Sequence, residues 1–437
     1  MHDIILWGQQ VDPIGLSVLL GMLAAVYFAI SFFSISFGLV ILALSSIFSP
    51  EISVGTIGIR DVTLRIEDLL IPVLLVAWMA QTAARWEGRW FAESPLNKPI
   101  LWLLGACLFS TLYGFLRGWV LFWSAFFYIG KIFEYFAIFF LVLNNVKTEH
   151  QIRVALFFAL LTVALLGLYT IPQVSQTGNF AAQRISAPFE ETPQPSTAGG
   201  YMAFFLIILS GLFLYADTLP KKWCLAALLC LIFIPFLFTF SRTSYLAFLG
   251  GMIILAVLAR KRWLNYSIIL LFLFSPLILP ASVKERIAFT WEDSKNVNRT
   301  MGVDYSTQER IYSLIKLKGV FKVSPLIGMG VGASHYMDNQ YARTIQELGI
   351  LGMGLWLWIF IRLFKIGQWL HRSLDGGLLK GVALGYAAGV VCILIHAWGS
   401  VTFYVIRIME PFWFVTGLVV SLYLIKTRET VRGANTG

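Results

Sequence analysis

The chain has 437 residues, and only 13% of them are charged, against about 25% in an ordinary soluble domain. Because 58% of the residues are hydrophobic, the composition excludes a water-soluble fold. Apolar runs such as 225–240 lack the alternating polarity of a transmembrane β-strand, so they exclude a barrel and predict helices. The formal charge of +10 does not indicate a nucleic-acid partner, since Lys and Arg lie mostly beside the ends of apolar runs, where positive charge orients helices.

Apolar runs of about 20 residues predict an all-α polytopic membrane protein with 12 or 13 membrane-spanning helices. The candidate spans are 14–31, 32–49, 68–84, 99–116, 121–145, 152–172, 197–216, 222–240, 243–260, 263–280, 349–368, 378–398 and 408–426. The first two are either two tight spans or one span and a re-entrant piece, so the side of the N-terminus stays open.

Basic clusters predict which face of the membrane each loop occupies. The clusters are Lys221 with Lys222, residues 260–262, residues 362–380 and residues 426–432. By the positive-inside rule they mark the cytoplasmic face, and the C-terminus with it. We therefore expect three regions: spans within 1–280, a long external loop at 281–348, and further spans with a short cytoplasmic tail at 349–437.

The long external segment contains an amphipathic stretch, which predicts an ordered helix lying on the membrane surface. Its apolar residues Ile311, Leu314, Ile315 and Phe321 oppose Arg310, Lys316 and Lys322.

Known catalytic motifs do not indicate a cofactor or a metal. The four cysteines all fall within apolar runs without a CxxC pair, which opposes a disulfide framework or a zinc site. HExxH, GxSxG and external DxD patterns are absent from the sequence. The GMGVG pattern at 328–332 lacks the GK[ST] of a phosphate loop, so it does not indicate nucleotide binding.

Arg242 is the only charged residue between Trp223 and Ala259. At about 1.5 Å per residue this stretch is too long for one span, so the chain must turn near the arginine. The sequence there, FTFSRTSYLAF, has no Gly or Pro, which predicts a tight turn that presents Arg242 at the external membrane boundary. One interpretation is an arginine that extends to the lipid headgroups. The other, which we favour because intramembrane charge is costly, is a fixed cation for an anionic substrate group.

Arg184 lies in a second external segment, AAQRISAPFEETPQPSTAGGY, in which Pro188, Pro193 and Pro195 oppose helix formation. Guanidinium groups bind phosphate oxygens in a bidentate manner, so Arg184 and Arg242 on one membrane face can together hold a diphosphate. The alternative for Arg184 is a solvated loop charge.

A glycine-rich stretch leads into His335, Asp338 and Asn339 and then into a short helix. His335 titrates near neutrality and Asp338 is a carboxylate, so either can accept a proton from a hydroxyl nucleophile. The alternative is structural: Asp338 or Asn339 caps the helix, Glu347 is solvated and Gly349 closes the helix.

The order of these elements resembles the O-antigen ligase and polymerase superfamily, bacterial membrane proteins that act on polyprenyl-diphosphate-linked glycans. The most specific part is QERIYSLIKLKGVFKVSPLIGMGVG followed by DNQYARTIQELGILG, within residues 308–352, which is similar to the family's long periplasmic loop. The segments around Arg184 and Arg242 support it. RIEDLLIPVLLVAWM, residues 65–79, is similar to the polysaccharide-polymerase-like branch.

The resemblance implies a fold of the GT-C glycosyltransferase type in the bacterial inner membrane, with the site facing the periplasm. The expected site residues are Arg184 and Arg242 for the donor diphosphate, Asp338 or His335 as the catalytic base, and Asn339, Tyr341 and Arg310 in support. In the lipopolysaccharide ligases a histidine immediately precedes the asparagine of the loop motif, whereas here that position is Asp338. This departure leaves the base open and favours a polymerase over a ligase.

We therefore predict an inverting, metal-independent O-antigen or exopolysaccharide polymerase, which transfers a polyprenyl-diphosphate-linked oligo- or polysaccharide to a hydroxyl acceptor on a glycan or lipid. The first alternative is an O-antigen ligase with lipid A core or a protein as acceptor. A flippase or transporter of the lipid-linked glycan is the alternative of another class, and a non-catalytic scaffold is a third. A transporter needs charged residues within several spans, and the sequence offers chiefly Lys131 with Glu134.

Overall fold

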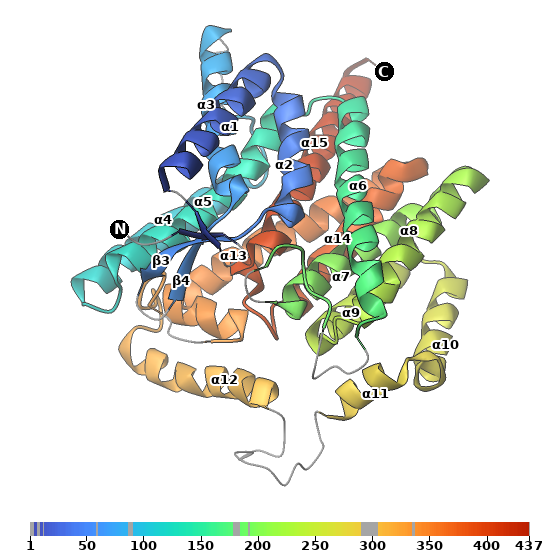
Figure 1. Ribbon diagram of the computed structural model, residues 1–437. Helices are drawn as coiled ribbons and strands as arrows, with labels where there is room; N and C mark the ends of the chain where they lie inside the picture. Colours follow the sequence, from blue (N-terminus) through green and yellow to red (C-terminus); the bar gives the residue numbers. More distant parts are fainter. Residues whose placement is uncertain are drawn as a thin grey trace.

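The computed structural model describes every residue except 1–3, 7–8, 12, 58–59, 86–90, 178–183, 191–192, 290–304, 334–336 and 437. The described chain forms a bundle of long helices, and two helices of the external segment lie across one end of it (Figure 1). The C-terminus lies at the opposite end of the bundle (Figure 1). Which of the two ends faces the cytoplasm stays a prediction.

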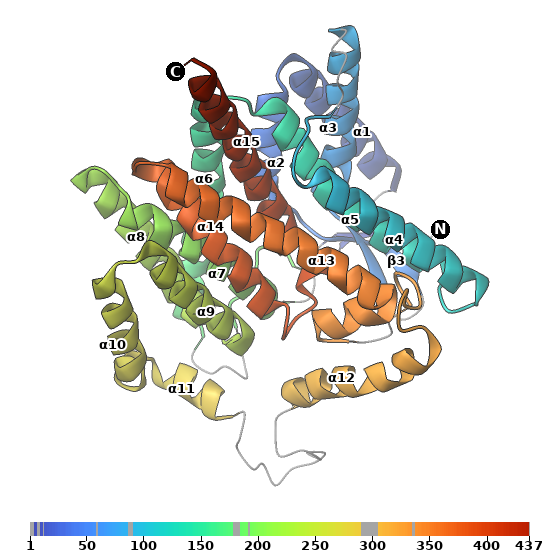
Figure 2. The same cartoon turned by 180° about the vertical axis from the view of Figure 1, so that it is seen from behind.

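Helices make up most of the described chain. They are α1 (Pro13–Phe33), α2 (Ile35–Phe48), α3 (Ile66–Ala84), α4 (Asn97–Leu116), α5 (Phe122–Asn145), α6 (Glu149–Val174), α7 (Pro195–Leu214), α8 (Leu219–Leu237), α9 (Arg242–Ala259), α10 (Arg262–Ile278), α11 (Ala281–Ala288), α12 (Tyr305–Val323), α13 (Gln340–Ser373), α14 (Gly377–His396) and α15 (Ile406–Thr436), with a short 3-10 helix, η1 (Thr402–Tyr404), before α15. Figure 2 shows α13 crossing the bundle beside α14, with α12 below its first turns.

The predicted all-α membrane fold is confirmed, and each of the thirteen candidate spans is occupied by a helix. Among the residues that the structure describes, ten helices are long and apolar enough to cross a membrane. Shorter than these are α2 with 14 residues, α10 with 17 residues and the apolar part Val18–Phe33 of α1. The first two candidate spans are two separate helices, because the chain is extended at Ser34.

A small antiparallel sheet, which we did not predict, joins the N-terminus to the connection between α2 and α3. Its strands are β1 (Ile4–Leu6), β2 (Gln9–Val11), β3 (Ile52–Ile57) and β4 (Arg60–Leu64), in the spatial order β2-β1-β3-β4. The pairing of β3 with β4 has an irregular register between Ser53 and Gly55. The search for apolar runs of about 20 residues misses these strands, because the longest of them has only six residues.

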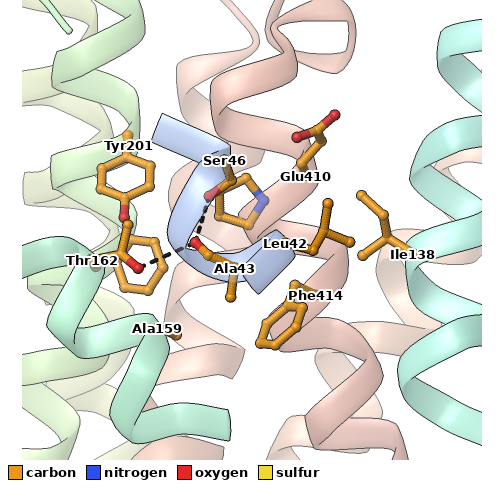
Figure 3. A pocket seen from close by; sticks show the side chains of 11 residues that line it. Leu42, Ala43, Ser46, Ile138, Ala159, Thr162, Tyr201, Glu410 and Phe414 are labelled. Atoms are coloured by element: carbon orange, nitrogen blue, oxygen red, sulfur yellow. Dashed lines mark hydrogen bonds between the residues drawn. The ribbon is translucent and has the colours of Figure 1, made fainter. Parts of the chain in front are cut away.

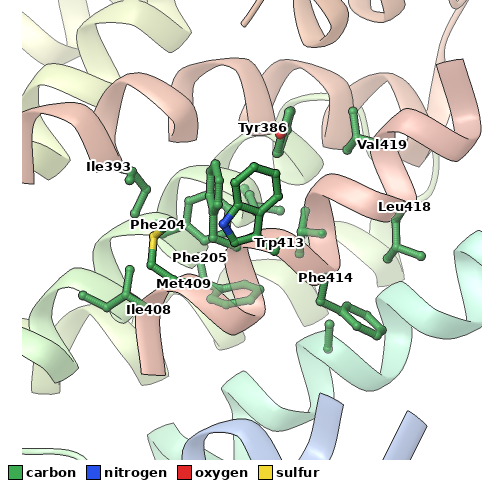
Figure 4. Packing of buried hydrophobic residues seen from close by; sticks show 14 of the residues in the cluster. Phe204, Phe205, Tyr386, Ile393, Ile408, Met409, Trp413, Phe414, Leu418 and Val419 are labelled. Atoms are coloured by element: carbon green, nitrogen blue, oxygen red, sulfur yellow. The ribbon is translucent and has the colours of Figure 1, made fainter. Parts of the chain in front are cut away.

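The centre of the bundle is formed by α7, α14 and α15. Their buried aromatic side chains pack together around Trp413, which lies edge-on to Phe136 at a ring-centroid distance of 4.8 Å. Figure 4 shows Trp413 with Phe204, Phe205 and Tyr386 in this cluster. In lipid the hydrophobic effect does little to hold helices together, so close side-chain packing of this kind supplies much of the association energy.

Glycines allow α7 and α14 to approach each other at backbone distance. A Cβ atom on Gly211 would lie 2.4 Å from the carbonyl oxygen of Gly381, and one on Gly385 would lie 2.7 Å from the Cα of Ile208. Gly381 and Gly385 are four residues apart and therefore share one face of α14. Small residues at this spacing are typical of close helix pairs in membranes.

Charged residues inside the bundle are more numerous than the sequence indicates. The predicted pairing of Lys131 with Glu134 is confirmed at 2.9 Å, and Lys131 also pairs with Asp68. Glu67 and Glu410 are fully buried as well. Glu410 borders a cavity of only about 20 Å³ between α2, α6 and α15 (Figure 3).

The contact between α7 and α14 generates a stability prediction. Gly211→Ala places a methyl group against the backbone of α14 and should lower the thermal unfolding midpoint of the purified protein, since overpacking costs about 1–3 kcal/mol. Gly354→Ala is the matched control, because a Cβ there meets no atom within 4 Å. Equal midpoints for the two variants in detergent would contradict the close approach.

Candidate functional site

A cavity of about 460 Å³ lies between the first turn of α9, the helices α11 and α12, and the connection after α14. It is lined by Arg242, Thr243, Tyr245, Leu246, Ile287, Thr307, Arg310, Ile311, Leu314, Asn339, Ile395, Trp398 and Gly399. The described part of the lining includes two arginines. The cavity therefore combines apolar walls with a positive charge, which suits an anionic group carried on an amphipathic molecule.

Arg242 is the first residue of α9, directly after the tight turn that the sequence predicts. Ser241 caps the helix, since its hydroxyl accepts a hydrogen bond from the backbone N–H of Ser244 at 3.4 Å. The turn is made without glycine, because Phe240 adopts a left-handed conformation with a φ of 50°. Such a backbone costs about 1–3 kcal/mol and is found most often at functional sites. Arg286 of α11 donates to the carbonyl of Phe240 at 3.4 Å and so fastens this turn.

Arg184 lies next to the same turn, although it comes from the connection between α6 and α7. The backbone N–H of Ile185 donates to the carbonyl of Phe238 at 3.2 Å. Arg184 itself is not among the residues that line the cavity, whereas Tyr245 is. That the side chains of Arg184 and Arg242 face one region stays a prediction.

Arg310 reaches the cavity from α12, a helix of the long segment between α10 and α13. Its guanidinium lies close to Gly399, since a Cβ atom there would be 3.2 Å from Cζ of Arg310 and 2.4 Å from the hydroxyl oxygen of Thr243. Gly399 thus leaves room for the arginine beside the first turn of α9. Further along α12, Leu317 and Val320 are buried against the start of α13.

Asn339 is the helix cap that the structural alternative predicts, and it also lines the cavity. Its carboxamide oxygen accepts from the backbone N–H of Ala342 at 3.0 Å, and its NH₂ group donates to the carbonyl of Trp398 at 2.9 Å. Asp338 is half-buried in the preceding position. His335 lies outside the described residues, so its place relative to Asp338 stays a prediction.

Tyr341 supports the wall of the cavity and is not among its lining residues. Its hydroxyl donates to the carbonyl of Leu394 at 2.6 Å, and its ring packs against Trp398 with a centroid distance of 6.1 Å. Trp398 is 56% exposed and lines the cavity. Tyr341 therefore acts on the site by holding the chain that follows α14.

His396 is a buried residue that the sequence analysis missed. Its Nε2 lies 3.2 Å from the hydroxyl of Ser244, and its Nδ1 lies 2.8 Å from the hydroxyl of Thr402. Ser244 in turn donates to the hydroxyl of Ser241 at 2.8 Å. This chain of hydrogen bonds ties the last turn of α14 to the N-cap of α9, and so to the position of Arg242.

Glu347 is fully buried, so the expectation that it is solvated is wrong. Its carboxylate accepts from Arg343 Nε at 3.0 Å and from the Tyr404 hydroxyl at 2.5 Å. The guanidinium of Arg343 lies 3.9 Å from the centroid of the Tyr404 ring, which adds a cation–π contact. Burial raises the pKa of Tyr404 well above its usual value, so the hydroxyl keeps its proton and remains a donor to Glu347.

Gly349 closes the helix that begins at Gln340, as the structural alternative predicts, because its backbone is not helical; a second helical part of α13 continues across the kink to Ser373. Gly349 has a φ of 68° and lies against the glycine-rich loop, whose backbone replaces the interrupted helical bonds. Ile350 and Leu351 donate to the carbonyls of Pro325 and Leu326 at 3.0 and 3.1 Å. In return, Met329 donates to the carbonyl of Gln346 at 2.8 Å and Gly330 to that of Glu347 at 2.9 Å.

Comparison with known families supports the resemblance that the sequence indicates. Residues 225–357 match the family described as O-antigen ligase. The matched segment runs from α8 into the second part of α13 and contains Arg242, Arg310, Asp338 and Asn339, while Arg184 lies outside it. A comparison with curated proteins finds no match.

The buried pair of Arg343 and Glu347 generates a prediction about stability. Glu347→Ala leaves the guanidinium of Arg343 buried without its carboxylate, and breaking a buried ion pair in this way costs about 3–5 kcal/mol. The variant should therefore unfold at a lower denaturant concentration in mixed micelles. Glu429→Ala, which removes a carboxylate that is 58% exposed, should shift the midpoint little. A Glu347→Ala midpoint equal to that of the wild type would contradict the buried pairing.

Proposed function

We propose that this protein, as a member of the O-antigen ligase and polymerase superfamily, transfers a glycan from a polyprenyl-diphosphate carrier to a hydroxyl acceptor. The observation that carries the proposal is the convergence of Arg242, Arg310 and Asn339 on one cavity of about 460 Å³, with Arg184 beside it. The cavity lies at the end of the bundle opposite the C-terminus, so we place the reaction at the periplasmic face of the bacterial inner membrane. A GT-C type architecture is part of the same proposal.

The reaction joins the acceptor oxygen to the anomeric carbon and breaks the bond between that carbon and the diphosphate oxygen. The acceptor proton passes to Asp338 or His335, and polyprenyl diphosphate leaves with the bonding electron pair. Negative charge grows on the diphosphate as the bond breaks, and fixed cations stabilise the transition state most where charge develops. Arg242 and Arg184 would supply these cations, with Arg310 above them from α12.

The protein is proposed to act as a polymerase, with another lipid-linked glycan as acceptor. The residue directly before Asn339 is Asp338 and not the histidine of the lipopolysaccharide ligases, so the group that activates the acceptor differs. A ligase that transfers to lipid A core or to a protein is the second candidate. The test below separates the two by their acceptors.

The small cavity and the paired charges inside the bundle argue against a transporter of the same lipid-linked glycan. The carboxylate of Glu410 borders a cavity of only about 20 Å³, which has room for about one water molecule but not for a diphosphate. Lys131 is paired with Asp68 and Glu134. In the described part of the bundle, Lys131 is thus paired with carboxylates and Glu410 lies beside a small cavity. The cavity of about 460 Å³ lies instead at one end of the bundle.

The donor arginines generate the first functional prediction. Arg242→Ala and Arg184→Ala should each reduce glycan transfer by about 100-fold or more, the usual effect of removing a group that stabilises developing charge. Both variants should unfold at the wild-type temperature. The matched control is Arg117→Ala, which removes an exposed arginine that stacks on Tyr113 and Trp119 outside the cavity. Wild-type transfer by both cavity variants would overturn the proposed site.

The base generates the second functional prediction. If Asp338 accepts the proton, Asp338→Asn should be nearly inactive, while His335→Ala keeps most of its rate. The reverse ranking would assign the role to His335, and tolerance of both changes would leave Asp338 a structural residue beside the helix cap. The measurement is the single-turnover rate at saturating donor, which reports the chemical step.

The proposed activity is tested with the purified protein in lipid nanodiscs and polyprenyl-diphosphate-linked repeat units as the only substrate. A ladder of lengthening glycans that is lost in Arg242→Ala would support a polymerase. Transfer that occurs only after lipid A core or an acceptor protein is added would support a ligase. Movement of the lipid-linked glycan between leaflets without any new glycosidic bond would reject both in favour of a transporter.

A further inference from the structure

A short segment that we call the strap, residues 184–190, connects the candidate site to the buried charges of the bundle. Arg184 is its first residue, beside the turn before α9. At the other end the backbone N–H of Glu51 donates to the carbonyl of Phe189 at 3.3 Å. Phe189 has a φ of 56°, the same unusual backbone conformation that Phe240 adopts at the turn. The strap is thus bent and fastened at both ends.

Arg407, at the start of α15, is the residue that holds the far end of the strap. Its side chain is 1% exposed. One guanidinium nitrogen donates to the carbonyl of Ile47 at 2.8 Å and to the carbonyl of Pro188. The other terminal nitrogen donates to the carbonyl of Ser49 at 3.0 Å. Arg407 therefore joins three main-chain carbonyls, two at the end of α2 and one in the strap.

Two carboxylates complete the surroundings of Arg407. Its guanidinium lies 3.8 Å from Glu51 and 4.0 Å from Glu190, the last residue of the strap. Glu51 also pairs with Arg65, the residue before α3. Burial raises the pKa of Glu190 to about 7. A buried arginine needs such partners, but here they come from only two segments, and one of them carries Arg184.

We propose that Arg407 is a positioning residue for the donor site: it fixes the strap at Pro188 and thereby holds Arg184 beside the cavity. The inference rests on the proposed role of Arg184 in binding the donor diphosphate. Pro188 is four residues from Arg184, and four residues span at most about 14 Å. Fixing one carbonyl therefore limits where the guanidinium of Arg184 can lie.

The geometry also explains why arginine occupies position 407. A planar guanidinium presents several N–H donors in fixed directions and can serve three carbonyls at once. A lysine ammonium is a compact charge with donors around a single nitrogen. Arg407→Lys should therefore keep the buried charge but lose some of the hydrogen bonds to the three carbonyls. Arg407→Gln should lose both the charge and those hydrogen bonds.

The first measurement is the rate of hydrogen–deuterium exchange in the strap, which does not depend on activity. In nanodiscs, Arg407→Gln should speed hydrogen–deuterium exchange in peptides that cover residues 184–190 by about tenfold or more, as expected when hydrogen bonds to a charged group are lost. Arg407→Lys should have a smaller effect, and peptides from α14 should exchange at the wild-type rate. Unchanged exchange of the strap in both variants would overturn the proposal.

The second measurement tests whether the strap acts through Arg184. Farnesyl diphosphate serves as the probe, and its dissociation constant is measured for Arg407→Lys, Arg184→Ala and the double variant. Each single variant should bind the probe about tenfold more weakly, and the double variant should bind it no more weakly than Arg184→Ala alone, because coupled residues are not additive. Additive losses would overturn the positioning role.

The matched control is Lys131→Gln, which alters a buried cation that contacts Asp68 and Glu134 but not the strap. It should leave probe binding unchanged, and a loss equal to that of Arg407→Lys would show a general effect of the buried charges and overturn the proposal. Failure of the role proposed for Arg407 can be distinguished from failure of the proposed function. If the wild type binds the probe with the expected coupling but forms no glycosidic bond, the proposed reaction fails and the role of Arg407 stands.

Discussion

The arrangement of the chain around the candidate site depends on one exchange of backbone hydrogen bonds in α13. A helix cannot be broken inside a bilayer unless the freed N–H and carbonyl groups find partners, because no water is present to satisfy them. At Gly349 the glycine-rich loop supplies those partners, and it accepts two hydrogen bonds and donates two in return. A Cβ atom on Gly349 would lie 2.2 Å from the carbonyl oxygen of Leu326, so only glycine permits this contact.

This exchange determines the path of the chain on both sides of the break. It holds the loop against α13, and Val331 of the loop donates to the hydroxyl of Thr111 in α4 at 3.1 Å. The carboxylate of Glu347 reaches Tyr404 just before α15. The break thus connects the loop that carries Asp338 with the last helix of the core. Arg407 extends the same principle, since its guanidinium satisfies the carbonyls at the end of α2 and in the strap.

The sequence predicts the features that follow from local composition. The spans, the turn at Arg242, a helix in the long segment after α10 and the cap at Asn339 each leave a pattern within a few neighbouring residues, and the structure has all four. The predicted apolar face of α12 is not confirmed, since Ile311, Ile315 and Phe321 are exposed. Glu347 and Arg407 leave no such pattern. Glu347 is predicted as solvated because it follows polar residues on a short helix, and its burial comes from Tyr404, 57 residues later in the chain. Arg407 contacts carbonyls about 360 residues earlier, a distance over which spacing carries no information.

Three of the candidate site residues lie where a helix begins or where the chain is not helical. Arg242 begins α9, Asn339 caps α13, and Arg184 begins the strap. Loops can present side chains to a ligand, but their backbone is held in place only by contacts with rigid neighbours. In this protein those contacts are buried and polar: His396 with Ser244, Tyr341 with Leu394, and Arg407 with Pro188. The geometry of the cavity is therefore set by residues that do not line it, and substitutions that change donor affinity should be sought among these contacts as well as in the cavity wall.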